Sequence, residues 1–152
     1  MLGIAVAFAA MFRDKINVKA VVVAFVFYLV VVTVAFAVVI HIWMPPGIPT
    51  QELARLAEND PTLVLWQRIL GVSVAIVAGY IACRLSGRSG LKNSTLVGGL
   101  LVLYGVLSIF MHPDDPALRQ IAKLLTPIPI VLLGGWICLR TAHRANAQSG
   151  DA

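Results

Sequence analysis

The feature that most constrains the fold is the run AVVVAFVFYLVVVTVAFAVVI, from Ala20 to Ile40, which contains no charged residue. A helix of this length spans about 30 Å, which is the thickness of the hydrocarbon core of a bilayer. The many valines would suit a strand in water, but a lone strand in lipid leaves its backbone polar groups without partners. The run therefore predicts a transmembrane helix.

The rest of the chain repeats this pattern less strongly. Charged residues make up 12% of the sequence and hydrophobic residues 59%, whereas a soluble domain has about 25% charged residues. Lys and Arg that flank a short apolar core can complete the span, because their side chains snorkel to the interface. The sequence therefore predicts an all-α membrane protein with four transmembrane helices, at about 20–43, 63–85, 94–112 and 124–143.

We expect residues 20–144 to form a single transmembrane domain, between a cytoplasmic or interfacial segment (1–19) and a flexible tail (145–152). The first stretch, MLGIAVAFAAMF, is too short to span a bilayer. It also lacks the positive charge that precedes the apolar core of a signal peptide. The apolar stretch is explained either as an interfacial segment or by translation that starts at Met11, and neither explanation implies cleavage.

The basic residues predict the orientation. They gather before the first span, between the second and third, and after the fourth, so most of the 12 Lys and Arg lie on one side. The positive-inside rule makes that side cytoplasmic, with both termini inside. Cations there attract anionic lipid headgroups by about 1 kcal/mol each. The residues expected to make such contacts are Arg84, Arg88, Lys92, Arg140 and Arg144.

The ends of the second and fourth spans resemble each other. AGYIACR aligns with GGWICLR, which matches Gly79 with Gly135 and Arg84 with Arg140. The match indicates a duplicated two-helix hairpin with both copies running the same way, related by an axis along the membrane normal. The biased composition of membrane segments also produces such matches by chance, so duplication and chance similarity both stay open.

The two outer loops are also alike, since each has an aromatic residue, a methionine and prolines before an amphipathic stretch. Short amphipathic helices are expected in both, with Thr50 and Asp115 as N-caps and Pro116 at a first helical position. Pro127 and Pro129 then open the fourth span, where first-turn amides lack helical partners anyway. A kinked or broken helix lining a site is the alternative.

The loop LSGRSGLKNST resembles a phosphate-binding Walker A motif at first sight. The motif needs Gly directly before Lys and then Ser or Thr, but no glycine directly precedes Lys92, and Asn93 follows it. Gly87 and Gly90 fit better as turn residues, and Asn93 or Ser94 as the cap of the next helix. The loop is therefore interpreted as a bend between two spans.

Small residues recur every four positions on the second span and at similar spacing on the third and fourth. Such residues let helix backbones approach closely where lipid removes the hydrophobic drive. They serve either the packing of the four helices in one chain or a face for a second copy or another membrane protein. The predicted helix-packing residues are Gly71, Ala75, Gly79, Cys83, Gly98, Gly105, Gly134 and Gly135.

The run GYIACRLSGRSGLKNSTLVGGLLVLYGVL resembles the central hairpin of small four-helix bacterial membrane proteins of unknown function, whose pattern is GGYxAxRxAGRxGxxxGxLxGxLxxL. The resemblance covers roughly a fifth of the chain. Asn93-Ser94 stands where the family tends to have a His-Gly pair. The resemblance implies a multi-pass protein of the bacterial inner membrane and supplies no activity.

Polar residues within the spans are candidates for function by default. No carboxylate lies within any predicted span, although proton-coupled transporters and intramembrane proteases normally need one at depth. The remaining polar groups can hydrogen-bond between helices for about 0.6–2 kcal/mol each. The candidates are Thr33, His41, Arg68, Ser73, Tyr80, Tyr104, Ser108 and His112.

Chemical sites are weakly indicated. His41 and His112, with Glu52, Asp114 and Asp115 nearby, could bind a metal outside the membrane, but no ligand spacing supports this. Ser108 and His112 share a helical face and could form a dyad, whereas a serine bonded to its own helix is the ordinary interpretation. Arg68 is expected to snorkel. Cys83 and Cys138 have no metal spacing and are expected to be free thiols that fill space.

The sequence therefore favours a protein that acts by helix–helix interaction, as an accessory or assembly subunit or as a scaffold of identical copies. A small transporter or channel for a neutral or weakly polar solute is the first alternative, and a membrane-embedded enzyme acting on lipid is the second. No cofactor or metal is predicted. Nucleic acid is not an expected partner, because no basic stripe follows one face.

Overall fold

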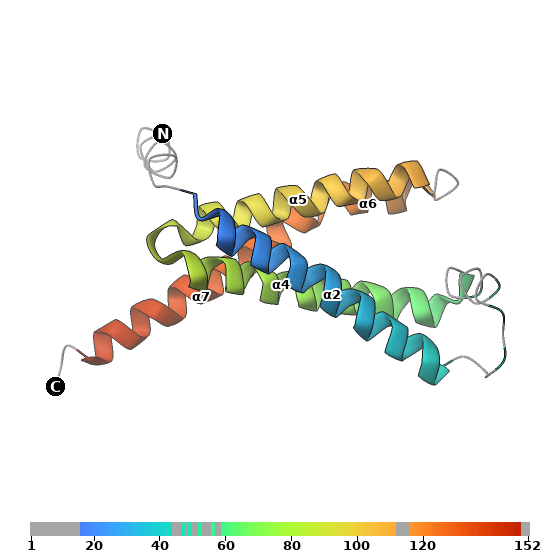
Figure 1. The fold of residues 1–152 in the computed structure, drawn as a ribbon, viewed down its shortest axis with the longest axis horizontal. Helices are drawn as coiled ribbons and strands as arrows, with labels where there is room; N and C mark the ends of the chain where they lie inside the picture. The colour runs from blue at the N-terminus through green and yellow to red at the C-terminus, as the bar shows by residue number, and fades with distance from the viewer. Residues whose placement is uncertain are drawn as a thin grey trace.

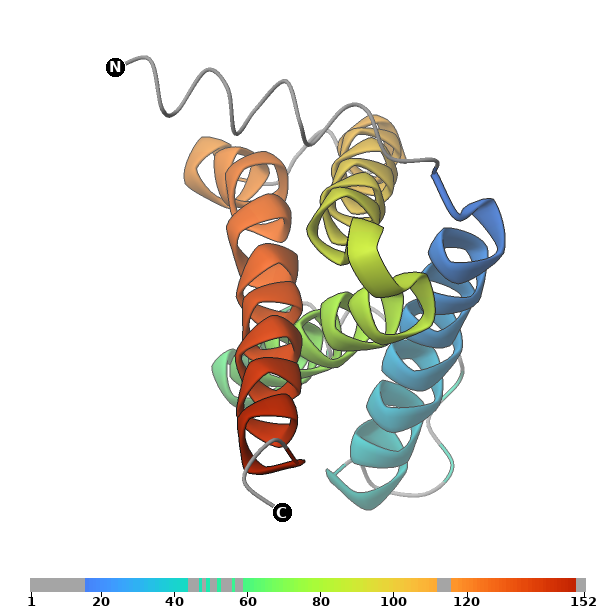
Figure 2. The same ribbon diagram turned by 90° about the vertical axis from the view of Figure 1, so that its left-hand side faces the viewer.

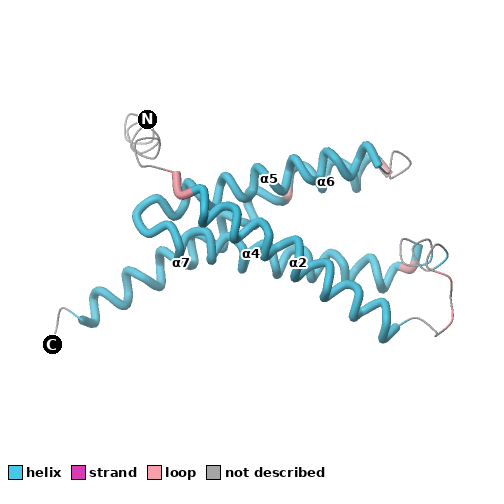
Figure 3. Tube along the Cα trace, viewed as in Figure 1, coloured by secondary structure: helices cyan, strands magenta, loops and turns pink. Residues whose placement is uncertain are grey.

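The structure is a computed structural model that describes residues 16–43, 47, 49, 52, 56, 59–111 and 116–149, and within them it contains helices and turns but no strand. The helices are α2 (Val18–Trp43), α4 (Pro61–Ser86), the short 3₁₀ turn η1 (Gly87–Ser89), α5 (Gly90–Met111), α6 (Ala117–Leu125) and α7 (Pro127–Ser149) (Figures 1 and 3). Four helical stretches are long and apolar enough to cross a membrane. The predicted all-α fold with four spans is confirmed.

The second span begins at Pro61 because Asp60 caps it. The Asp60 carboxylate accepts hydrogen bonds from the backbone N–H of Thr62 (2.7 Å) and of Leu63 (3.1 Å). Proline at the first helical position loses nothing, since its missing N–H would have no helical partner there. The cap extends the helix beyond the predicted start at residue 63.

The connection between α4 and α5 is a bend, as the sequence indicates, but the third span begins earlier than expected. Gly87 ends α4 with a φ of 58°, a conformation that glycine adopts at little cost. After η1, Gly90 is already helical, with a φ of −55°. Asn93 and Ser94 therefore lie inside the first turns of α5, and the prediction that one of them caps the helix at residue 94 is wrong.

The fourth span is broken into α6 and α7 at Thr126. Pro127 and Pro129 have no N–H, so the helical hydrogen bonds that these residues would donate are missing. Thr126 bridges the break, because its N–H donates to the carbonyl of Ala122 (3.1 Å) and its carbonyl accepts from Ile130 (3.3 Å). α7 begins at Pro127, so the prolines lie in its first turn as the sequence indicates, and the apolar span continues from Gln120 to Ala142 across the bend at Thr126.

α6 is therefore part of a span as well as the short amphipathic helix expected after the third span. It packs against α5 and leads into α7, which continues along α5 (Figure 1). Its first residue is Ala117, with Pro116 at the capping position instead of inside the helix. Asp115, Thr50 and most of the first outer loop lie outside the described residues.

α4 is the central helix and contacts α2, α5 and α7, while α2 and α7 share no extended contact (Figure 2). The core is made of small and medium side chains from four helices, because the backbones come close together. Its buried residues are Val21, Ala24, Ala75, Ala78, Ala82, Val97, Leu101 and Val131. We call the end of the bundle at Gly87–Ser89 the η1 end and the opposite end, where α2 ends and α4 begins, the far end.

Candidate functional site

α4 and α7 run in the same direction and meet along a seam of glycines. A Cβ atom at Gly79 would collide with the backbone oxygen of Val131, and one at Gly134 would collide with that of Ile76. Neither glycine could be replaced without separating the two backbones. The glycines thus serve to bring two parallel spans into backbone contact, as expected of small residues in lipid.

The contacts across this seam are reciprocal. Gly79 meets the backbone of Val131 and Gly134 meets that of Ile76. Ile76 and Val131, Gly79 and Gly134, and also the buried Cys83 and Cys138, are each 55 positions apart in the sequence. The sequence alignment matched Gly79 with Gly135 instead. Successive side chains on a helix point about 100° apart, so Gly135 faces a different neighbour than Gly134, which lies on the seam. The symmetry is local, because α5 packs against α4 while α2 has no comparable contact with α7.

Cys83 and Cys138 extend the seam toward the η1 end. Both thiols are free and buried, 2% and 4% exposed. Gly90 at the start of α5 leaves room for them, since a Cβ there would collide with the Cys83 sulfur. Thiols buried in apolar surroundings are poor nucleophiles. Their arrangement fits a packing role.

Ser94 joins three helices at the seam. Its hydroxyl is fully buried and lies 2.9 Å from the carbonyl of Gly79 and 3.0 Å from that of Gly90, so it donates toward both. A Cβ at Gly135 would lie 2.6 Å from the Ser94 oxygen. The hydroxyl therefore links α5 to α4 beneath the backbone of α7.

Asn93 performs a similar task at the η1 end. It is fully buried, and its amide donates to the Ser89 carbonyl and hydroxyl, both at 3.1 Å. Its side-chain oxygen accepts from the backbone N–H of Asn17 (3.2 Å), and the Asn17 amide donates to the Leu85 carbonyl (3.2 Å). This network ties the start of α2 to the end of α4. The sequence does not predict this network, although two adjacent polar residues, Asn93 and Ser94, in a glycine-rich span are a usable signal of buried hydrogen bonds.

The remaining predicted packing glycines face different neighbours. A Cβ at Gly98 would lie 3.0 Å from the Cα of Ile128, and one at Gly105 would lie 2.8 Å from the carbonyl oxygen of Lys123. A Cβ at Gly71 would lie 3.8 Å from the Tyr28 hydroxyl oxygen, an ordinary contact distance, and Ala75 is buried in the core. These small residues pack the helices of one chain against each other.

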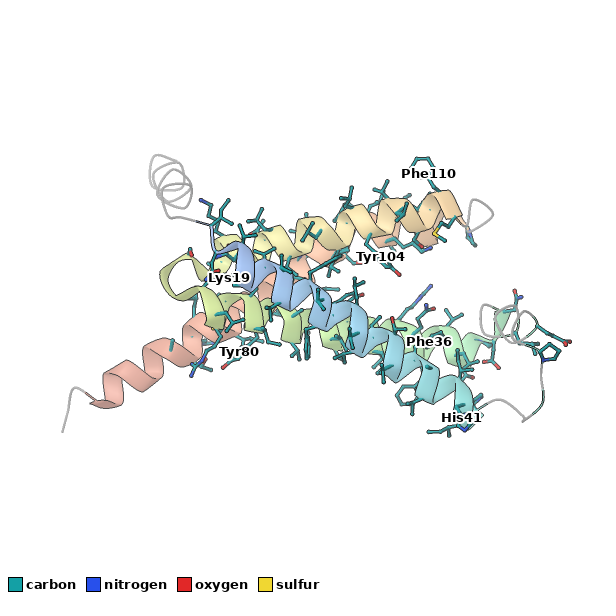
Figure 4. The ribbon with its side chains drawn as sticks, viewed as in Figure 1. Lys19, Phe36, His41, Tyr80, Tyr104 and Phe110 are labelled. Carbon is teal, nitrogen blue, oxygen red and sulfur yellow. The ribbon has the colours of Figure 1, made fainter. Side chains whose placement is uncertain are left out.

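The predicted intramembrane polar residues do not come together. Thr33, His41, Arg68 and Ser73 are exposed, and Tyr80 is half-buried. Figure 4 shows Tyr80 near the η1 end, His41 at the far end of α2, and Tyr104 on α5. A polar cavity lined by Thr33, Ser73, Tyr80 and Tyr104 would favour the transporter alternative, but Thr33, Ser73 and Tyr104 are exposed and Tyr80 is half-buried.

Ser108 is held by a lysine. The Lys123 ammonium on α6 donates to the Ser108 hydroxyl (3.1 Å), which joins α6 to α5. His112, the proposed base of a Ser108 dyad, lies outside the described residues, as do Asp114 and Asp115. Among the residues that the structure describes, no group of three His, Cys, Asp or Glu could hold a metal ion.

The cations predicted to contact lipid headgroups lie along the η1 end. Arg84 is exposed, Lys92 is half-buried, and the Arg140 guanidinium stacks on Trp136 at 4.9 Å from the ring centroid. Stacking places the charge beside an amphipathic ring, which suits a membrane interface. The side chains of Arg88 and Arg144 lie outside the described residues.

No family model, curated protein or solved structure matches the chain. The resemblance of the Gly-Tyr-x-Ala-x-Arg hairpin to small bacterial membrane proteins therefore stays a prediction. The functional conclusion must come from the structure of the bundle itself.

Proposed function

We propose that the protein works by helix–helix association in the membrane, as an accessory or assembly subunit or as a scaffold of identical copies. The small residues for which the sequence left a partner face open are mostly used inside the chain, so they do not carry this proposal. What supports it is the surface of α2.

Of the four apolar stretches that the structure describes, the one in α2 has the smallest buried share. Only 6% of it is buried, compared with 33% for the one in α4. The surface of α2 carries β-branched residues at every fourth position, each 50–74% exposed. The row turns around the helix axis by about 40° per member, so about three consecutive members share one face. We call this row the valine ridge: Val18, Val22, Val26, Val30, Val34, Val38 and Ile42.

A ridge of this kind is suited to another helix. Residues four apart form the rows that pack into the grooves of a neighbouring helix. Valine and isoleucine already have a fixed χ1 in a helix, so they lose little side-chain freedom on contact. In lipid, where no hydrophobic drive exists between helices, such packing is what stabilises association. The valine ridge is the observation that carries the proposal.

Photocrosslinking tests this directly. A photoreactive residue at Val30, on the ridge, should give one adduct of defined mass in the native membrane. The same residue at Leu103 on α5, which is 65% exposed but off the ridge, should react with lipid alone. Equal adduct formation at both positions, or lipid adducts at both, would refute the proposal.

The broken fourth span favours a second candidate, a small transporter or channel for a neutral or weakly polar solute. Transporters place binding sites at interrupted helices, where backbone carbonyls lose their partners. Thr126 and the two prolines make such an interruption here. Reconstituted vesicles would show solute flux that Pro127→Ala changes, and an unchanged leak in the variant and in empty vesicles would remove this candidate.

A further inference from the structure

The glycine seam between α4 and α7 leads, one helical turn further on, to a pair of cysteines. Gly134 on α7 packs between two turns of α4, because a Cβ there would collide with the Ile76 carbonyl oxygen and lie 3.0 Å from the Tyr80 nitrogen. A residue four positions further along a parallel helix lies about one turn higher. Cys138 is therefore level with the next turn of α4, which contains Cys83.

Both cysteines also lie on the faces by which the two helices meet. Cys83 follows Gly79 by four positions, as Cys138 follows Gly134, and residues four apart lie close together on one side of a helix. Cys83 is 2% and Cys138 is 4% exposed, whereas Ile137, the neighbour of Cys138 in the chain, is 37% exposed. The two thiols thus point inward from adjacent, parallel helices.

The seam holds the two backbones at a separation that a disulfide can bridge. A Cβ at Gly79 would lie 3.1 Å from the Cα of Val131. With a carbon–carbon bond of about 1.5 Å, the Cα atoms of Gly79 and Val131 are within about 4.6 Å of each other. Cysteines joined by a disulfide have Cα atoms roughly 4.4–6.8 Å apart. This close approach lies only one turn from Cys83.

The surroundings of the pair favour a neutral link over a charged one. Gly90 at the start of α5 covers the Cys83 sulfur so closely that a Cβ there would collide with it. Two thiolates on a soft metal ion such as Cu(I) would bury a net negative charge, which is costly in apolar surroundings. A disulfide carries no charge and gives up both thiol protons.

We propose that Cys83 and Cys138 are a redox latch, which closes as a disulfide between α4 and α7 when hydrogen peroxide reaches the η1 end. The Cys83 sulfur attacks peroxide, which breaks the O–O bond and yields a sulfenic acid and water. The Cys138 sulfur then attacks the sulfenic sulfur, so that the S–S bond forms and a second water leaves. Two electrons pass from the thiols to peroxide, and a cellular thiol such as glutathione returns them by exchange.

Burial determines when the latch closes. Both thiols are protected in the closed bundle, so peroxide enters only as the η1 end, which faces the viewer in Figure 2, opens. Cys83 is reached first, because it lies three residues before the end of α4 at Ser86 and directly beneath Gly90. The basic residues predict that this side is cytoplasmic, where disulfides are usually transient and redox-sensing.

The test exposes the full chain to hydrogen peroxide in membranes of its own host, blocks the remaining thiols with N-ethylmaleimide in SDS, and maps the peptides by mass spectrometry. The wild type should yield peptides joined through Cys83 and Cys138, and should lose both maleimide labels together. Dithiothreitol should separate the joined peptides. The purified oxidised protein should unfold at a higher SDS fraction than the reduced protein, because the link closes a long loop in the unfolded chain.

The matched control combines Cys138→Ser with Ile137→Cys, which keeps two thiols but places one of them on the surface. It should lose the link, because the two Cβ vectors then point apart.

Three outcomes overturn the proposal. The wild type keeps both maleimide labels after peroxide, or the wild type and the control link equally. The third is a link that is present before peroxide and persists after peroxide is removed, because a permanent disulfide is not a latch. The first and third outcomes use the wild type alone, so the folding of the control does not affect them. The valine ridge is on α2, so failure here leaves the proposed function intact.

Discussion

Replacing Gly79 with alanine tests how closely α4 and α7 are required to approach. The added Cβ would collide with the Val131 carbonyl oxygen and lie 2.9 Å from its carbon and 3.1 Å from its Cα. Carbon atoms in contact are normally about 3.5–4.0 Å apart. Because these are backbone atoms, no side-chain rotation relieves the overlap, and the helices must separate.

The cost can be worked from two opposing effects. Overpacking costs 1–3 kcal/mol, and separation here also loosens the reciprocal contact between Gly134 and Ile76, so about 3 kcal/mol is expected. Alanine recovers about 1 kcal/mol through its higher helix propensity. The net destabilisation should be about 2 kcal/mol, which is roughly a 30-fold change in the unfolding equilibrium.

Unfolding of purified protein in mixed detergent and SDS micelles, followed by circular dichroism, measures this difference. Gly99→Ala is the matched control, because nothing lies within 4 Å of a Cβ at Gly99, and it should be neutral or stabilising. If Gly79→Ala unfolds at the same SDS fraction as Gly99→Ala, the seam is not a backbone contact and the packing described here is incorrect.

Three further substitutions probe other contacts in the same assay. Ser94→Ala removes the buried hydroxyl between α4 and α5 and should cost about 1 kcal/mol; no change would mean that the link is not formed. Asn93→Leu leaves the Asn17 N–H without its acceptor and should cost 1–3 kcal/mol, together with faster proteolysis before α2. Unaltered proteolysis would contradict the network. Asp60→Ala removes the cap of α4 and should cost about 1 kcal/mol, whereas Asp60→Asn should keep most of it; equal losses would argue against capping.

The four spans were predictable because lipid imposes one dominant rule, that apolar segments of sufficient length form helices. Their ends were less predictable, since local chemistry sets them. α4 begins at Pro61 instead of residue 63, because Asp60 caps the helix and proline is accepted at its first position. α5 begins at Gly90 instead of residue 94, because the helix starts directly after the 3₁₀ turn. The break at Thr126 was visible as two prolines but could not be distinguished from an ordinary first turn.

The small residues were identifiable from their spacing, but their neighbours were not. Gly79 and Gly134 face each other's helix, Gly105 faces α6, and Gly99 faces open space. A spacing of four residues predicts which small residues lie close together on one helix. The neighbours that those residues contact depend on where the other helices lie. Asn93 and Ser94 were taken for caps for the same reason, because a buried link and a cap use the same residue types.

The most direct test of association is the native mass spectrum of the protein extracted in mild detergent from its own host. If the protein associates through the valine ridge, the spectrum contains a complex of defined stoichiometry with a second copy or one foreign chain. Val30→Phe on the ridge then dissociates this complex, and Leu103→Phe does not. A wild-type spectrum containing only monomer, with or without bound lipid, would contradict it.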